Sequence, residues 1–303
     1  MTTNVIAILG LKKPTSSSPG KQALDMFKDL MLHLDGTGED EIRLAHAEAI
    51  ATRFGAHLTG LYANPLPDYM VAFGGEPGFT AMSAVVEMEQ RARAEGDLVL
   101  ARLEARFQRV AAPHEIRRIA AQRIDIPGLS ASQARWADLF VASAPYRNSD
   151  AHVGDRLLES VLFEGGRAVY AIPPGGKPRE ETRGILIAWR DTRESARAVA
   201  EALPFLRRAA KTRLVTVDAQ GGRVEPAMDV AAHLDRHGVD VEIMAVEAGN
   251  RTVAQILIEE AHKLSADLIV MGAYGHSRFR EWILGGATRE MLETSDVPIF
   301  MAH

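Results

Sequence analysis

The sequence has no cysteine among its 303 residues. Disulfides, thiolate metal sites and cysteine nucleophiles are therefore excluded as sources of its stability or chemistry. Long runs of lysine and arginine are missing too, and the formal net charge is −5. Because proteins that bind nucleic acid usually carry a basic patch, we expect no nucleic-acid partner.

Long hydrophobic runs are equally scarce. The apolar stretch at residues 5–11 is too short to span a bilayer. No positive charge precedes it, so it does not resemble a signal peptide. We expect a cytoplasmic protein that has no membrane partner.

Several enzyme motifs are also missing. No HExxH motif contains His233 and His237. Their charged neighbours indicate a solvent-exposed helix surface instead of a metal site. No GxSxG elbow occurs, and Gly176 and Lys177 are followed by Pro178 without the upstream glycine of a P-loop. We therefore name no catalytic residue and no metal ligand. We expect that the protein is not an enzyme, although slow ATPase activity stays open.

The composition that remains, 47% hydrophobic and 25% charged residues, is typical of one or two globular domains. Apolar runs alternate with helical patterns, which indicates a parallel sheet covered by helices on both faces. In the first half we expect a long exposed loop at 64–80. The strands and helices expected there lie at 29–35, 39–54, 56–62, 81–107, 115–121, 137–143 and 167–174.

The same pattern then restarts. Strands are expected at 184–189, 212–219, 239–246, 266–272 and 297–303, with helices at 193–210, 226–237 and 252–264. The segment ADLFVAS at 137–143 lines up with ADLIVMG at 266–272. A repeat of this size indicates a duplicated domain, because solenoid units are far shorter. We therefore predict an α/β protein with two tandem Rossmann-like domains of the flavodoxin type, each with roughly five parallel strands.

The domain boundaries follow from composition. Residues 1–27 form an extension rich in Pro, Ser and Lys, which favours a mobile arm over a docked strand. The first repeat is assigned to 28–174, a Pro- and Gly-rich linker to 175–182, and the second repeat to 183–303.

One loop in the second repeat has the pattern of a phosphate-binding site. Gly272 and Gly275 follow a buried strand, and nine residues later Gly285 precedes an expected helix at 289–294. Free amides at a helix N-terminus, together with the helix dipole, favour a phosphate. The Thr288 hydroxyl could add a hydrogen bond. The alternative is that the glycines only mark two tight turns.

The segment VMGAYGHSRFREWILGGATREML (270–292) resembles the G-x2-G-x9-G-[Ser/Thr] signature of the universal stress protein family. Residues 187–206 resemble that family's first strand and helix. The resemblance implies ATP or AMP binding in part of the family, with Mg²⁺ only if ATP binds. It also implies packing through strand edges. This packing gives a possible homodimer, or in a tandem chain it is satisfied by the two repeats of the same chain. Carried over position by position, the resemblance implies that Ala188 and Val217 form a wall for adenine and that the backbone of Met271 contacts the ribose. Gly272 and Gly275 would meet the ribose and the phosphates. The phosphates would be bound by Gly285, Gly286, Ala287 and Thr288.

Three departures from the family pattern matter. Gly286 stands where the family has Ser or Thr, so one hydroxyl is lost. Arg190 replaces an Asp that often follows the first strand. In the first repeat Pro145 falls inside the loop that replaces the first GxxG; it removes an amide, so that loop is not expected to hold phosphate. We expect at most one nucleotide per chain.

Two hypotheses on function follow from these patterns. The first is an adenine-nucleotide sensor or regulator of a stress response, which acts on an unknown protein partner. The second is a nucleotide-independent interaction protein of the same fold, whose apolar strand edges mediate assembly, above all residues 298–301.

Overall fold

The structure, a computed structural model, describes residues 5–7, 27–68, 79–145, 152–179, 181–218, 225–274 and 286–303. This part of the chain forms one sheet of eleven strands in the order β1-β9-β8-β7-β10-β11-β6-β5-β2-β3-β4. The strands are β1 Val5–Ala7, β2 Asp29–Leu34, β3 His57–Leu66, β4 His114–Gln122, β5 Leu139–Ser143, β6 Ala168–Ile172, β7 Gly184–Ala188, β8 Lys211–Asp218, β9 Glu242–Glu247, β10 Leu268–Gly272 and β11 Ile299–Ala302.

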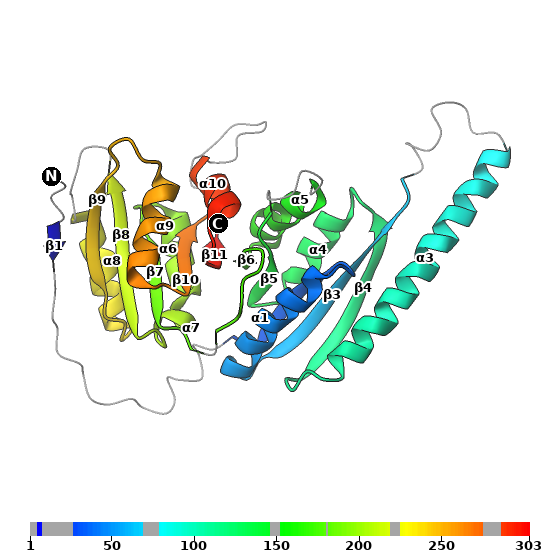
Figure 1. Ribbon diagram of the computed structural model, residues 1–303, viewed down its shortest axis with the longest axis horizontal. Coiled ribbons are helices and arrows are strands. Elements are labelled where there is room, and N and C mark those ends of the chain that lie inside the picture. The colour runs from blue at the N-terminus through cyan, green and yellow to red at the C-terminus, as the bar shows by residue number, and fades with distance from the viewer. Residues whose placement is uncertain are drawn as a thin grey trace.

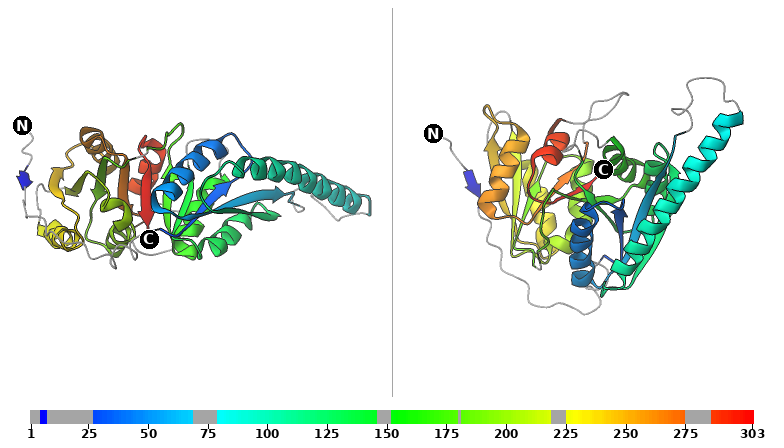
Figure 2. Two further views of the ribbon diagram at one scale, coloured as in Figure 1. Left: turned by 90° about the horizontal axis from the view of Figure 1, so that it is seen from below. Right: turned by 45° about the vertical axis from the view of Figure 1, so that its right-hand side comes forward.

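Helices lie on both sides of this sheet (Figures 1 and 2). They are α1 Glu39–Phe54, α3 Phe79–Phe107, α4 Ile126–Ala134, α5 His152–Ser160, the π-helical turn η2 Val161–Gly165, α6 Arg193–Glu201, α7 Leu203–Leu206, α8 Glu225–Arg236, α9 Val253–Leu264 and α10 Gly286–Thr294. The long helix α3 runs along the outer edge of the first repeat, beside β3 and β4 (Figure 1).

Each half of the sheet has the same topology. The order is β4-β3-β2-β5-β6 in the first repeat and β9-β8-β7-β10-β11 in the second, and all pairs within a repeat are parallel. In each repeat the order reverses between the first strand and the fourth strand. The predicted fold of two tandem Rossmann-like domains is confirmed.

The two halves join through their last strands. β11 pairs with β6 in antiparallel register, with Ile299 opposite Ala171 and Met301 opposite Val169. The edge at residues 298–301 is therefore paired within the chain, because β6 covers it; this is the internal pairing open to a tandem chain and not an exposed edge for another chain. Internal pairing removes the unpaired backbone groups that would invite another chain.

Strand residues alternate between two buried clusters, one on each face of the sheet. On β2, Leu30 and Leu32 lie in the cluster beneath α1, α3, α6 and α8, whereas Met31 lies in the cluster beneath α5, α9 and α10. On β10, Val270 and Ile269 divide in the same way. Both faces are apolar because a parallel sheet buried on both sides needs no polar alternation.

Several local expectations differ from the structure. β3 continues to Leu66 and pairs with β4, so the exposed loop expected at 64–80 starts too early; Pro65 is tolerated because β2 ends its pairing at Tyr62 and leaves that side of the strand open. The helix expected at 193–210 is two helices, α6 and α7, divided just before Pro204. Residues 5–7 pair with β9 as a strand, the alternative to a mobile arm. Sequence periodicity missed α4 and α5.

Candidate functional site

The candidate site of the second repeat lies where its strand order reverses, between the carboxyl ends of β7 and β10. Ligands of open α/β sheets bind in the crevice at this switch point. Met271 on β10 pairs with Ala188, the last residue of β7. The chain then reaches Ala273, whose N–H donates to the carbonyl of Ala302 on β11 (2.8 Å). The strand ends are thus fixed on both sides of β10.

The start of α10 returns to the tip of β10. The Tyr274 N–H donates to Thr288 Oγ1 at 3.3 Å, and Thr288 is buried. Tyr274 has φ +57°, a left-handed conformation that is costly for a residue with a side chain. α10 begins at Gly286, so Gly286, Ala287 and Thr288 form its first turn, and the helix starts three residues earlier than predicted. The Thr288 hydroxyl is used to tie the loop to the helix.

The expected adenine wall also lies at this rim. Ala188 and Val217 are half-buried and pack against the same apolar cluster. Met271 is buried in that cluster. The structure therefore brings Ala188, Val217, Met271, Gly272 and Thr288 to one end of the sheet. Gly275 and Gly285 lie outside the described residues, as do residues 276–284 of the spacer.

Gly272 has a packing role that the sequence did not reveal. A Cβ built on it would lie 2.6 Å from the backbone nitrogen of Ser195 and 2.7 Å from the carbonyl carbon of Glu194. These atoms belong to the first turn of α6. Real Cβ atoms do not approach backbone so closely, so α6 can reach the tip of β10 only because residue 272 is glycine.

We predict that Gly272→Ala lowers the free energy of unfolding by about 1–3 kcal/mol, because backbone must shift to admit a methyl group. Urea denaturation measures this change. Gly286→Ala is the matched control: a Cβ there meets no atom within 4 Å, and we expect no loss of stability. Equal stability of the two variants would contradict the packing role.

The first repeat contributes to the loop of the second. The Phe163 ring of η2 lies 5.2 Å from the Tyr274 ring and 4.3 Å from the imidazole of the C-terminal residue His303, measured between ring centroids. The His303 imidazole in turn bonds the carbonyl of Ala273 through Nδ1 (3.0 Å). No sequence pattern identified Phe163, because its position depends on how the two repeats pair.

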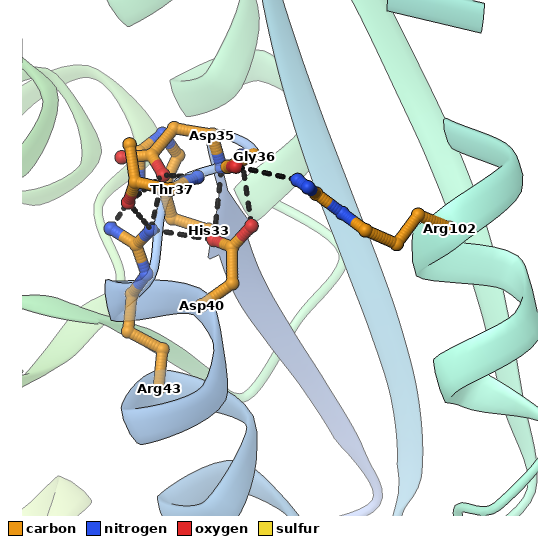
Figure 3. A network of polar contacts seen from close by, with 7 residues as sticks. All are labelled: His33, Asp35, Gly36, Thr37, Asp40, Arg43 and Arg102. Atoms are coloured by element: carbon orange, nitrogen blue, oxygen red, sulfur yellow. Dashed lines mark hydrogen bonds and ion pairs between the residues drawn. The ribbon is translucent and has the colours of Figure 1, made fainter. Parts of the chain in front are cut away.

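The equivalent end of the first repeat is filled by its own side chains (Figure 3). Arg43 on α1 is buried and contacts Asp35 (2.5 Å) and Asp40 (2.6 Å). Asp40 accepts the backbone N–H groups of Asp35 (3.1 Å) and Gly36 (2.8 Å). Asp35 accepts both the N–H and the hydroxyl of Thr37. The backbone N–H groups of Asp35, Gly36 and Thr37, just after β2, are therefore bonded to side chains of the same repeat.

Arg43 sets the electrostatics of this cluster. Burial by itself would raise the pKa of Asp35, but the adjacent Arg43 guanidinium outweighs it and holds that pKa well below its usual range. Burial raises the pKa of Asp40, against the opposing effect of Arg43. Burial, reinforced by Arg43, lowers the pKa of His33 from 6.5 to about 3. His33 is therefore a neutral base, whose Nδ1 faces Arg43 Nη1 at 3.4 Å.

This shift predicts a pH dependence of folding. A histidine whose pKa is depressed in the folded state binds its proton mainly when unfolded, so stability is complete above about pH 6.5 and falls as the pH drops toward 3. Between pH 7 and pH 5 the free energy of unfolding should fall in both proteins. We expect this fall to be about 2 kcal/mol smaller in His33→Gln than in the parent protein. Urea denaturation at both pH values measures this difference. Parallel losses in the two proteins would contradict a neutral buried His33.

The described residues offer no group of three His, Asp or Glu that could hold a metal ion. His233 and His237 do lie together, with ring centroids 4.5 Å apart, but Arg207 contacts His237 Nδ1 at 3.0 Å, and an arginine there disfavours a bound cation. Within the described ranges, none of the helices is long and apolar enough to cross a membrane.

Comparison with known proteins shows which family and which solved structures this chain is similar to. Residues 181–303 match the model of the Universal stress protein family. A search of curated proteins gives no match. A universal stress protein from Archaeoglobus fulgidus DSM 4304 is similar in structure, with TM-score 0.65 and 15% identity over 90% of this chain and 95% of its own. A functionally unknown protein from Pseudomonas aeruginosa PAO1 gives TM-score 0.56 and 13% identity over 93% and 94%.

A universal stress protein solved in complex with cAMP is also matched, at 14% identity over 48% of this chain and 96% of its own, with TM-score 0.28. The cAMP is a ligand of that protein.

Proposed function

Because residues 181–303 match the model of the Universal stress protein family, we propose that the chain binds one adenine nucleotide at the switch point of its second repeat. ATP or AMP would lie across the ends of β7 and β10, and Mg²⁺ would accompany ATP alone. In this proposal the protein is a sensor or regulator and not an enzyme, and occupancy of the site alters its contacts with a protein partner.

The observation that carries this proposal is the position of α10. Its first turn, Gly286–Thr288, meets the tip of β10 through the hydrogen bond from the Tyr274 N–H to Thr288 Oγ1. The first amides of a helix have no partner within the helix, and their dipole favours an anion. Strain at Tyr274 agrees with this role, since left-handed non-glycine residues are concentrated at ligand sites.

The proposed adenine end is apolar. Ala188 and Val217 stand half-buried at the ends of β7 and β8, where a flat ring could cover them. Arg190 follows β7 and is exposed. In this position it supplies positive charge near the phosphates, a role that the family's Asp could not fill.

A thermal-shift assay with ATP and AMP tests the proposal. A ligand that binds only the native state at 100 times its Kd stabilises it by about 2.7 kcal/mol. We expect a rise in Tm with millimolar nucleotide and release of nucleotide when freshly purified protein is denatured and analysed by mass spectrometry. No shift and no released nucleotide would favour the interaction protein that works without nucleotide.

A further inference from the structure

The two repeats meet next to the tip of β10, beside the proposed nucleotide site. β6 and β11 are antiparallel, with Val169 opposite Met301. The start of β6 therefore lies beside the end of β11, and η2, which shortly precedes β6, comes to the carboxyl ends of the second repeat's strands. The C-terminus of the chain lies between the two halves (Figure 1). An element of the first repeat thus borders the loop that leaves β10.

Three rings form the contact between this element and the loop, and we call them the junction cluster: Phe163 of η2, Tyr274 after β10 and His303 after β11. The Phe163 centroid lies 5.2 Å from that of Tyr274 and 4.3 Å from that of His303. Aromatic rings at such distances attract one another beyond the effect of the area they bury. Phe163 is 47% exposed and belongs to neither buried cluster, so the junction cluster is a contact at the surface.

His303 connects the junction cluster to the backbone of the loop. Its Nδ1 bonds the Ala273 carbonyl at 3.0 Å, and Arg193 Nη2 lies 3.4 Å from its Nε2. Since arginine can only donate, Nε2 accepts and the Nδ1–H donates to Ala273. Arg197 donates to the backbone oxygen of His303 at 2.8 Å and to the Gly166 carbonyl of the first repeat. Contacts from both repeats therefore hold the His303 ring against the loop.

The loop needs such support because Tyr274 is strained. Its φ of +57° is left-handed, and its N–H makes only a long hydrogen bond of 3.3 Å to Thr288 Oγ1. A left-handed residue with a side chain persists where its surroundings hold it. The contact with Phe163 keeps the Tyr274 ring against η2 and so favours this conformation. Tyr274 and Thr288 together join the tip of β10 to the first turn of α10, which carries the proposed nucleotide site.

From these contacts we propose that Phe163 of the first repeat is a positioning residue for the nucleotide site of the second repeat. Phe163 holds Tyr274 in the conformation that joins β10 to α10, so the first repeat tunes the affinity of the second repeat's site. This inference rests on the proposed function, because it concerns the affinity of that same site.

Hydrogen exchange of the full chain without nucleotide, followed by mass spectrometry, tests the positioning itself. In Phe163→Ala we expect the amides of Ala273 and Tyr274 to exchange about fivefold faster, the equilibrium factor of one lost aromatic contact. Phe163→Tyr keeps a ring and should keep the parent's rates. Leu129→Ala is the matched control: Leu129 is 44% exposed and lines the same surface groove as Phe163, outside the junction cluster. Exchange in β5 should stay unchanged in all three variants.

Calorimetric titration with ATP then tests the link to the nucleotide. We expect Phe163→Ala to bind ATP about fivefold more weakly, and Phe163→Tyr and Leu129→Ala to match the parent protein. Unchanged exchange at Ala273 and Tyr274 in Phe163→Ala, or faster exchange with unchanged ATP affinity, would overturn the inference. A parent protein that binds no ATP would refute the proposed function, whereas the exchange rates alone would still support or overturn the positioning of the loop by Phe163.

Discussion

Replacing Arg43 with methionine should lower the free energy of unfolding by about 3–5 kcal/mol. The Arg43 side chain is 4% exposed, and it holds Asp35 and Asp40 at 2.5 and 2.6 Å. Removal of the guanidinium leaves two carboxylates close together, with Asp40 buried. Burying a charge without its partner costs far more than the ion pair contributes when intact. Urea denaturation at pH 7 measures the loss.

Arg91→Gln provides the control for this variant. Arg91 also pairs with a glutamate, Glu87, but both side chains are more than 70% exposed. Exposed pairs contribute little, so we expect a change within about 0.5 kcal/mol. The Arg43→Met loss should also shrink at low pH, where the carboxylates take up protons. A loss below about 1 kcal/mol at pH 7 would show that the Arg43 cluster does not stabilise the first repeat.

Replacing Ala287 with glutamate should weaken ATP binding by about a hundredfold, because its charge would lie beside the phosphates in the first turn of α10. Two like charges about 4 Å apart repel by roughly 4 kcal/mol near a protein surface, which is more than a hundredfold in affinity before screening by salt. Folding should not suffer, since an acidic residue at a helix N-terminus is favourable by about 0.3–1 kcal/mol. Calorimetric titration with ATP measures the affinity.

Ala287→Gln separates charge from bulk at the same position. Glutamine has nearly the shape of glutamate without its charge, so it should retain most of the affinity for ATP. Ala287 is half-buried, and if side-chain bulk decides, both variants should lose affinity equally. That result, or unchanged affinity in Ala287→Glu, would remove α10 from the proposed site.

Much of the architecture could be predicted because it depends on local patterns. The continuous apolar run of β10 indicated a strand buried on both faces, and the matching run of β5 revealed the duplication. Boundaries failed where tertiary contacts decide. β3 runs through Pro65 because β4 continues beside it, and Gly286 joins α10 although glycine disfavours helices.

The candidate site was predicted in part. Spacing placed Gly272 and Thr288 at one end of the sheet, but it could not show that Gly272 admits α6 or that Thr288 accepts the Tyr274 N–H. The Arg43 cluster and the Phe163 contact were missed, because each joins residues from different elements through space. The occupation of the segment after β2 by Arg43, Asp35 and Asp40 was also missed.

We propose that one site per chain, in the second repeat, holds an adenine nucleotide. Native mass spectrometry of the full chain with ATP measures this directly, because it counts bound nucleotides. We predict one nucleotide per chain in the parent protein and in Arg91→Gln, and none in Ala287→Glu at the same concentration. Two nucleotides per chain, or one that Ala287→Glu retains, would contradict the claim.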